Sequence, residues 1–365
     1  MIGCVRLILC CAMVRRASRG TNVTISDVAT DAGVSPTTVS RVLNGGYPVA
    51  KPTRLQVEKV VRELGYIRNA HAQALRGTST GVVGVIIHDV ADPYFSEIVA
   101  GIQEVAAAHQ RLVVLCNSLR DPASELRYVQ MLRGQRVDAI ILTGGAIEDA
   151  AYLRAIRQDA SALKQQGARM VICGRYSSVT TPTVVPDNRR GGELLTKHLI
   201  EKGHRRIVEV MGPPNFSTTE ERSTGHRDAL AEAGVERDPL LAIHGRFTRE
   251  SGYEATRAML ASGATFTAVY AANDLMAVGA LAALREAGLR VPEDVSLVGF
   301  DDIPTVRDMM PRLTTIRVPM REMGRRSMEI AIGAGDRQPR VVVLPVELVE
   351  RESVARPTLR SRRSG

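Results

Sequence analysis

The chain contains, at residues 35–44, the stretch Ser35-Pro36-Thr37-Thr38-Val39-Ser40-Arg41-Val42-Leu43-Asn44, which predicts a short helix with two unlike faces. Ser35 can accept hydrogen bonds from the first free backbone N–H groups, and Pro36 suits the first helical position. One face is apolar at helical spacing and consists of Val39, Val42 and Leu43. The other face carries donors and acceptors without a carboxylate, on Thr37, Ser40, Arg41 and Asn44. Such a helix can lie along a polyanion and read base edges.

A second short helix is expected directly before this stretch. Thr24 is a suitable N-cap, and Asp27 three residues later completes a weaker form of the capping box. Gly33 can adopt the left-handed conformation that ends such a helix. Two short helices joined by a tight glycine turn, the second of them polar, indicate a helix-turn-helix. The same pattern also occurs in ordinary helical hairpins, so the motif alone leaves both interpretations open.

The residues that follow complete a small N-terminal region and lead out of it. A third helix is predicted from about Pro52 to Leu64, with an apolar face at helical spacing and Gly65 as its stop. The segment Asn69–Arg76 is rich in helix formers. Two glycines then bracket the polar Thr78-Ser79-Thr80, which predicts a domain boundary.

Charge and cysteine content narrow the class of protein. The 365 residues carry a formal net charge of +9, and residues 15–80 hold ten Arg and Lys against four Asp and Glu. This balance favours a polyanionic partner without identifying one. The five cysteines are odd in number and lack the spacing of a zinc site. They therefore indicate a reducing cytoplasm rather than a disulfide framework.

Residues 1–20 fit poorly with the region behind them. The apolar run Ile8–Val14 is too short to span a membrane. Arg15-Arg16 directly after it, and the lack of a small-residue cleavage pattern, argue against a signal peptide. We expect residues 1–20 to be a poorly ordered extension that results from a misassigned start codon, with Met13 as one candidate for the true start.

From Val82 the pattern changes to alternating strands and helices. Apolar runs predict strands at Val82–Ile87, Leu112–Leu115, Ala139–Leu142, Met170–Ile172, Ile207–Val210, Ala268–Tyr270 and Val295–Val298. Helices are predicted near Phe95–His109, Ala123–Arg133, Gly191–Lys202, Ser223–Ala233, Ser251–Ala261 and Leu275–Ala287. Alternation predicts parallel sheets with covered faces, and the length of this region predicts two α/β subdomains. Because ligands of such sheets bind beyond the carboxyl ends of strands, we expect ligand-binding residues at Asp89, Asn273-Asp274 and Asp301-Asp302.

Several longer motifs occur in a recognisable order and spacing. They are Val23–Ala29 with Ala32–Ser35, Thr38–Asn44, Leu64–Ile67 with Asn69, Glu201–Ile207, Asn273-Asp274 and Pro292–Asp302. Together they resemble the lactose-repressor (LacI/GalR) family of bacterial transcription regulators, over nearly all of the chain from about Asn22 to Thr358.

For the N-terminal region, the resemblance implies a helix-turn-helix domain at residues 21–68, with Ser35–Asn44 as its recognition helix, and a hinge helix and linker at residues 69–80. Leu75 would be the leucine that wedges into the minor groove. Two residues depart from the family pattern: Arg68 replaces a usual proline, and Ala50 replaces a Ser N-cap at a cost of about 1 kcal/mol. The implied DNA-binding residues are Thr24, Ser35, Pro36, Thr37, Thr38, Ser40, Arg41, Asn44, Tyr47, Asn69, Ala72, Leu75 and Arg76.

For the α/β region, the resemblance implies an effector-binding and dimerisation domain at residues 81–356, built like a periplasmic sugar-binding protein. Its N-subdomain would comprise about 81–186 and 318–344 and its C-subdomain about 187–317 and 345–356, followed by a basic tail at 357–365. The implied effector-binding residues are Tyr94 and Phe95 in an N-subdomain loop, with Arg222, Phe247, Asn273 and Asp301. We expect Asp302 to cap the following turn. Phe216 stands where purine-sensing relatives have an arginine, which favours a carbohydrate.

The implied function is a cytoplasmic, sequence-specific DNA-binding repressor. It would bind a pseudo-palindromic double-stranded operator as a homodimer, under the control of a small-molecule effector such as a sugar. We expect no cofactor, no metal and no membrane association. A periplasmic-type sugar-binding transport protein is the alternative, but it would need an export signal and would lack residues 21–76. An enzyme is not expected, because the chain has no Walker or Rossmann phosphate loop, no HExxH and no nucleophile constellation, and most of its histidines are expected at the surface or at helix ends.

Overall fold

The structure is a computed structural model that describes residues 23–44, 48–66, 79–334 and 340–357. The chain forms two compact units, residues 1–72 and residues 73–365. Within the described ranges, no helix is long and apolar enough to cross a membrane.

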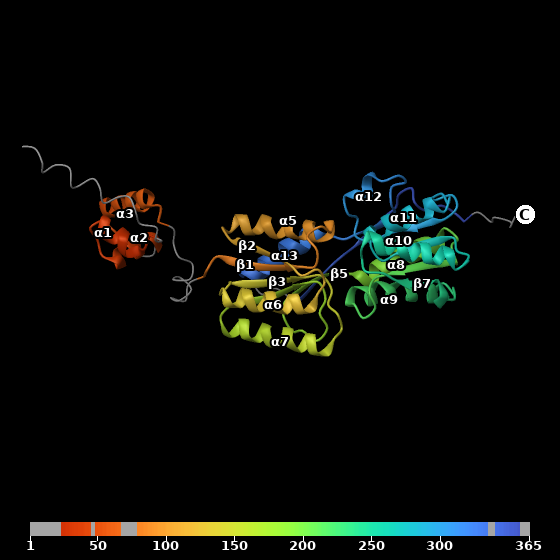
Figure 1. Cartoon of the computed structure of the whole chain (residues 1–365), viewed down its shortest axis with the longest axis horizontal. Coiled ribbons are helices and arrows are strands. Elements are labelled where there is room, and N and C mark those ends of the chain that lie inside the picture. The colour runs from red at the N-terminus through yellow and green to blue at the C-terminus, as the bar shows by residue number, and fades with distance from the viewer. Residues whose placement is uncertain (1–22, 45–47, 67–78, 335–339, 358–365) are drawn as a thin grey trace, which may run out of the picture. The chain divides into compact units, whose positions relative to one another are not determined.

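The described residues of the first unit form three short helices: α1 (Ile25–Asp31), α2 (Pro36–Asn44) and α3 (Lys51–Leu64) (Figure 1). Their apolar faces meet in one small core, in which the side chains of Val28, Val39 and Val57 are fully buried. Burial of the apolar face of α2 leaves Thr37 and Arg41 exposed on its polar face, as the sequence predicts.

The ends of these helices are fixed as the sequence predicts. The hydroxyl of Thr24 accepts a hydrogen bond from the N–H of Asp27 at 3.3 Å, and the Asp27 carboxylate accepts one from the N–H of Thr24 at 2.9 Å. Gly33 has a φ of 63°, the left-handed conformation that ends α1. Ser35 accepts a hydrogen bond from the N–H of Thr38 at 3.1 Å. The predicted capping box, glycine turn and N-cap are therefore confirmed, and Ala50 indeed provides no side-chain cap for α3.

The second unit begins with a six-stranded parallel sheet of order β11-β5-β4-β3-β1-β2. Its strands are β1 (Val82–Ile87), β2 (Leu112–Asn117), β3 (Ala139–Thr143), β4 (Arg169–Cys173), β5 (Thr183–Pro186) and β11 (Val341–Leu344). Helices α5 (Pro93–Ala108) and α13 (Met320–Ile332) cover one face, and α6 (Pro122–Gly134) and α7 (Ala150–Gln165) cover the other (Figure 1). The central strands β1 and β3 are thus buried on both faces, as their continuous apolar runs require, while the edge strands β2 and β11 are partly exposed.

A second, four-stranded parallel sheet has the order β7-β6-β8-β9. Its strands are β6 (Ile207–Met211), β7 (Ala242–His244), β8 (Ala268–Ala271) and β9 (Ser296–Val298), and α8 (Asn188–Glu201), α9 (Ser217–Glu232), α10 (Arg249–Ala261) and α11 (Asp274–Glu286) cover its faces. Helices α8 and α9 approach very closely: a Cβ on Gly225 would lie 1.9 Å from the carbonyl oxygen of Arg189. Glycine at this crossing fixes α9, and with it the side chain of Arg222, against α8.

Each sheet with the helices that cover it forms one α/β layer, the six-stranded sheet the first and the four-stranded sheet the second. Two short antiparallel strands, β10 (Thr315–Arg317) and β12 (Glu347–Val349), join the two layers. After β10 the chain enters α13 of the first layer, and from β11 it returns through β12. The short helices η1 (Pro239–Leu241) and α12 (Thr305–Asp308) complete the described elements of this unit. The boundaries predicted for the two subdomains remain a prediction.

The α/β class with parallel sheets is confirmed, but several elements were not predicted. Helices α7 and α13 and strands β5, β7 and β10 were missed, and α9 begins at Ser217, six residues before its predicted start at Ser223. The missed turns of α9 bury polar side chains such as Ser217, Thr219 and Arg222. Without apolar periodicity, these residues gave no helical signal.

Candidate functional site

The loops at the carboxyl ends of the two sheets border one cleft with about 400 Å³ of space, part of it open to solvent. All six residues proposed from the sequence as effector-binding line it. The full lining is His88, Asp92, Tyr94, Phe95, Arg120, Gly144, Gly145, Phe216, Thr218, Arg222, Phe247, Asn273 and Asp301. Of the residues expected from their position after a strand, Asn273 and Asp301 line this cleft, whereas Asp89, Asp274 and Asp302 do not.

Tyr94 and Phe95 enter the cleft from the first turn of α5, so the prediction that they lie in a loop is wrong. Asp92 is the N-cap of this helix and accepts a hydrogen bond from the N–H of Tyr94 at 3.0 Å, while Pro93 takes the first helical position. Phe95 is 4% exposed and belongs both to the core of the first layer and to the cleft wall. A helix start is stiffer than a loop, so these rings present a fixed apolar surface.

Arg222 and Asp301 form a buried ion pair at the base of the cleft. The guanidinium Nη2 donates to Oδ1 of Asp301 at 2.9 Å, Nη1 donates to the carbonyl of Ala272 at 2.6 Å, and Nε donates to Asn188 at 3.1 Å. The guanidinium also lies 3.6 Å from the ring centroid of Phe300. Burial raises the pKa of Asp301 to about 7, although the charge of Arg222 acts in the opposite direction. These contacts hold the guanidinium in one orientation and leave two of its five N–H groups for a ligand.

Asn273 and Phe247 are held to each other. The side chain of Asn273 caps α11 by accepting a hydrogen bond from the N–H of Met276 at 3.0 Å, and its Nδ2 donates to the carbonyl of Phe247 at 3.3 Å. Phe247 has a φ of 59°, which is unusual for a residue with a side chain. Its ring meets that of Phe216 edge to face, with centroids 6.1 Å apart. Strained backbone at such a position is typical of a binding site, where the surrounding structure holds it.

His88 is a cleft residue that sequence reasoning missed. The expectation that the histidines lie at the surface or at helix ends is wrong for it, since it is 3% exposed and its Nε2 lies 3.0 Å from Oε1 of Glu125. The hydroxyls of Ser118, Tyr152 and Tyr176 also donate to Glu125. Burial raises the pKa of Glu125, but hydrogen bonds from these groups, led by His88, bring it below its ordinary value. The expectation is also wrong for His226, which is buried in the middle of α9, whereas the buried His198 does lie in the last turn of α8.

The one feature of the sequence that could have indicated His88 is its position directly after the strand β1. Arg120 and Asp92 were missed as well. The guanidinium of Arg120 lies 3.2 Å from the carboxylate of Asp92 and reaches the cleft from the loop after β2. Its partner is 28 residues away in the sequence. No local pattern marks such a pair. Asp89, expected as a ligand-binding residue, instead accepts a hydrogen bond from the N–H of Ala91 within its own turn.

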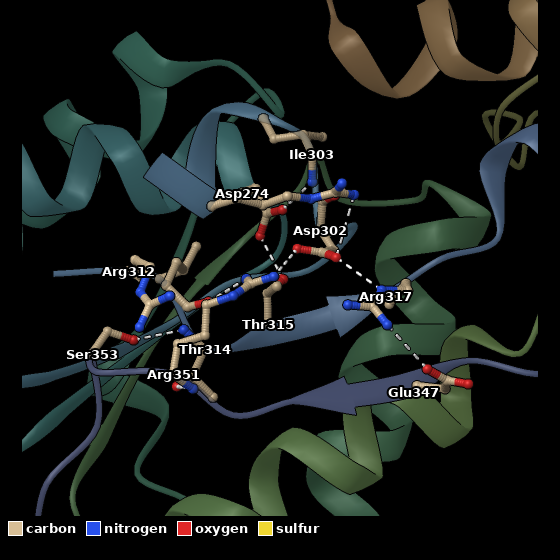
Figure 2. Close-up of polar contacts among 12 residues, drawn as sticks. Asp274, Asp302, Ile303, Arg312, Thr314, Thr315, Arg317, Glu347, Arg351 and Ser353 are labelled. Atoms are coloured by element: carbon tan, nitrogen blue, oxygen red, sulfur yellow. Dashed lines mark hydrogen bonds and ion pairs between the residues drawn. The ribbon is translucent and has the colours of Figure 1, made fainter. Parts of the chain in front are cut away.

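Asp302 has a different role from the predicted cap. It is fully buried, and its carboxylate lies 2.6 Å from Nη2 of Arg351, 3.0 Å from Nε of Arg317 and 3.4 Å from Nη2 of Arg307 (Figure 2). Arg317 ends β10 and Arg351 follows β12. The carboxylate therefore connects the loop after β9 to both strands that join the two layers.

The residues predicted to bind DNA divide into two groups. Ser35, Pro36, Thr37 and Arg41 are exposed at the start and along the polar face of α2, and Thr38 and Ser40 are half-buried beside them. Thr24 is exposed and caps α1. Tyr47, Asn69, Ala72, Leu75 and Arg76 lie outside the described residues, as does the side chain of Asn44.

Comparison with known proteins places this geometry in a family. Residues 24–69 match the family described as bacterial regulatory proteins, lacI family, and residues 80–352 match the periplasmic binding proteins and sugar binding domain of the LacI family. The chain belongs to the LacI family of bacterial regulatory proteins. It is therefore a DNA-binding transcriptional regulator with an effector-binding domain.

LacI-family relatives match over nearly their whole length. The HTH-type transcriptional regulator GalR of Escherichia coli (strain K12) is 35% identical over 92% of this chain and 97% of its own. The ribose operon repressor of Halalkalibacterium halodurans is 32% identical over 90% of this chain and 96% of its own. The solved structure of the lac repressor dimer bound to operator and the anti-inducer ONPF has a TM-score of 0.77 at 31% identity, and covers 92% of this chain and 100% of that one.

Proposed function

We propose that this LacI-family regulator is a repressor that binds a pseudo-palindromic DNA operator as a homodimer, under the control of a neutral carbohydrate in the cleft. The observation that carries the proposal is the cleft lining, in which a fixed arginine, an acidic acceptor and several aromatic faces converge. Hydroxyl groups of a sugar suit the polar groups, and the apolar face of its ring suits the phenylalanines.

The charges of the cleft favour a neutral ligand over an anionic one. Each basic side chain of the lining has an acidic partner: Arg222 pairs with Asp301, Arg120 with Asp92 and His88 with Glu125. The carboxylates of these pairs would repel a phosphate or carboxylate ligand, whereas a neutral sugar hydroxyl can donate a hydrogen bond to one of them. The structure of the regulator CelR with cellobiose has a TM-score of 0.67 at 34% identity, covers 91% of this chain and 100% of that one, and shows a carbohydrate ligand in a relative.

The exposed face of α2 supports its role as the recognition helix. Thr37 lies on this face in the first turn of the helix, where base edges are read in related geometries, and Arg41 lies on the same face in the last turn. Arginine reads guanine with two parallel hydrogen bonds. We therefore assign base contacts to these residues and phosphate contacts to the exposed Lys51 and Arg54 of α3.

The edge strand β2 is our proposed subunit contact in the homodimer. Leu112 and Leu115 are 61% and 40% exposed, and Val114 and Leu119 add further exposed apolar surface. An apolar edge strand left open to water pairs readily with another chain. A second copy of the same chain fits this patch, because two-fold dimers use the same surface twice.

This function implies a cytoplasmic location, because the operator of a bacterial repressor lies there. We assign no catalysis, cofactor or metal to the cleft. A sugar-binding transport protein would share the α/β unit but has no use for residues 24–69, which match DNA-binding regulators.

The test of the function is selection of fragments from the source genome by the purified full-length protein at physiological salt, followed by sequencing. Low salt would allow the basic region to bind any DNA. Enrichment of one or a few palindromes is the expected result, and the genes beside them suggest sugars for a thermal-shift panel with cellobiose, D-ribose, D-galactose and adenine. A protein that enriches no sequence with or without this panel would contradict the proposal.

A further inference from the structure

The carboxylate of Asp138 collects hydrogen bonds from the residues just before β1. Its Oδ1 accepts from the N–H and the hydroxyl of Thr80 at 2.7 and 2.9 Å. Its Oδ2 accepts from the N–H of Gly81 at 3.0 Å and from the hydroxyl of Ser79. Two consecutive backbone N–H groups on one carboxylate fix the direction of the main chain, not only the position of a side chain.

Arg111 completes this cluster, which we call the clamp (Ser79, Thr80, Gly81, Arg111 and Asp138). Its Nη1 lies 2.8 Å from Oδ2 of Asp138 and also donates to the hydroxyl of Ser79. The side chains of Arg111 and Asp138 are only 26% and 21% exposed. Partial burial raises the pKa of Asp138, but the hydrogen bonds from Ser79, Thr80 and Gly81 outweigh it and bring this pKa below its ordinary value. The carboxylate is thus charged at neutral pH.

The clamp lies at the amino ends of three adjacent strands. Gly81 precedes β1, Arg111 precedes β2 and Asp138 precedes β3. The backbone is continuous with the sheet here, since the N–H of Asp138 donates to the carbonyl of Val82 and the N–H of Leu112 to that of Gly81, both at 2.8 Å. The cleft lies at the opposite ends of the same strands, about 17 Å away at about 3.3 Å per residue.

Strands β1 and β3 are close-packed between these two ends. Val83, Val85 and Ile87 of β1 and all of Ala139–Leu142 of β3 are at most 1% exposed. Such a core does not bend continuously, so a change at the cleft reaches the amino ends as a movement of the whole layer. Whatever is fixed to the amino ends must follow that movement.

We propose that Asp138 is a positioning residue for DNA binding: through the clamp it fixes the end of the linker to the sheet, so that the dimer sets the spacing of its two DNA-binding units. This inference rests on the proposed function. Without the clamp, the linker would pivot at residues 79–81, and the two units would no longer be held at one half-site spacing.

The test uses the full-length protein and three variants. Asp138→Ala removes the clamp from the side of the sheet, and Ser79→Ala with Thr80→Val removes the hydroxyl donors from the side of the linker. Asp121→Ala is the matched control, because Asp121 caps the neighbouring α6 through the N–H groups of Ala123 and Ser124 but makes no clamp contact. The DNA probes are the palindrome recovered by genomic selection and the same palindrome with two base pairs inserted at its centre.

We expect the insertion to weaken wild-type binding about a hundredfold and Asp138→Ala binding only about tenfold, since a freely pivoting linker tolerates altered spacing. Amide hydrogen exchange at Thr80 and Gly81 should be at least about ten times faster in Asp138→Ala. Asp121→Ala should lose thermal stability and keep the wild-type spacing penalty.

Two results would overturn the inference. One is an unchanged spacing penalty in folded Asp138→Ala, and the other is unchanged exchange at Thr80 and Gly81. If Asp138→Ala does not fold, the double variant on the linker decides by the same two measurements. A wild-type protein with no preference for any palindrome would defeat the proposed function and the clamp together, whereas a wild-type penalty retained in the variants defeats the clamp alone.

Discussion

The carboxylates of Asp301 and Asp302, neighbours in the sequence, are bound by different sets of arginines. Asp301 accepts a hydrogen bond from Arg222 in the cleft, whereas Asp302 is held by Arg317 and Arg351 at the joining strands (Figure 2). Both residues have positive φ values, 116° and 58°. The cleft and the joining strands therefore share one short, strained piece of backbone, and an effector that moves Asp301 acts directly on the connection between the layers.

Asp302→Asn should lower the free energy of unfolding by about 3 kcal/mol, because it leaves the largely buried Arg351 without its carboxylate. Urea unfolding followed by circular dichroism measures this loss. Glu352→Gln is the control, since the pair of Glu352 with Arg312 is about half exposed and solvent screens its attraction, so its loss should change the free energy of unfolding much less. Equal losses in the two variants would show that Asp302 is only one more surface ion pair.

Arg222→Lys should weaken effector binding at least about a hundredfold, because an ammonium cannot reproduce the planar set of N–H donors. The measurement is calorimetric titration with the sugar that gives the largest thermal shift in the panel. Arg227→Lys, on the same helix but 40% exposed, should bind as the wild type does. Wild-type affinity in Arg222→Lys would remove this arginine from the effector site.

How much of this site the sequence predicts depends on how far apart the interacting residues are in the sequence. Position after a strand is a local property, and it leads to Asn273 and Asp301 directly; the aromatic and arginine positions came from the family resemblance. His88 and Arg120 escaped because their partners, Glu125 and Asp92, are distant in the sequence and no pattern links them. Asp302 was misassigned for the same reason, since its arginines follow later strands.

Prediction of the fold from the sequence is limited in the same way, to features that are local in the chain. Strands buried on both faces are continuous apolar runs, and β1 and β3 were predicted within one residue of their bounds. The first turns of α9 are buried through polar side chains and close glycine contacts, which leave no hydrophobic period to detect. Tertiary contacts, not local preference, determine such segments.

Thr37→Ala should relax operator specificity by about 1–3 kcal/mol at one base position, whereas Arg54→Ala should weaken binding to all sequences alike. Thr37 lies on the exposed face of α2, and Arg54 is exposed on α3. Affinities for single-base variants of the selected palindrome measure both effects. The assignment is reversed if Arg54→Ala changes the ranking of sequences and Thr37→Ala leaves it intact.

Stability should fall as pH rises through the range over which Asp301 titrates. Burial raises the pKa of its folded form from an ordinary 3.8 to about 7, so the native state binds more protons than the unfolded state between these values. The difference in melting temperature between wild type and Asp301→Asn, measured from pH 4 to pH 8, isolates this carboxyl from other titrating groups. It should grow in favour of the variant as pH rises, and a constant difference would contradict the assignment.

Leu115→Asp should dissociate the dimer, because it places a charge in the apolar patch proposed as the subunit contact. Leu115 is 40% exposed on the edge strand β2, and a desolvated, unpaired carboxylate there would weaken association by at least about tenfold. Val343→Asp is the matched control: Val343 is 53% exposed on β11, the opposite edge strand of the same sheet. Sedimentation equilibrium compares the two variants with the wild type. Dissociation by Val343→Asp alone would move the contact to the other edge, while dissociation by Leu115→Asp should also abolish preference for the palindrome over its half-site, since only a dimer can occupy both halves.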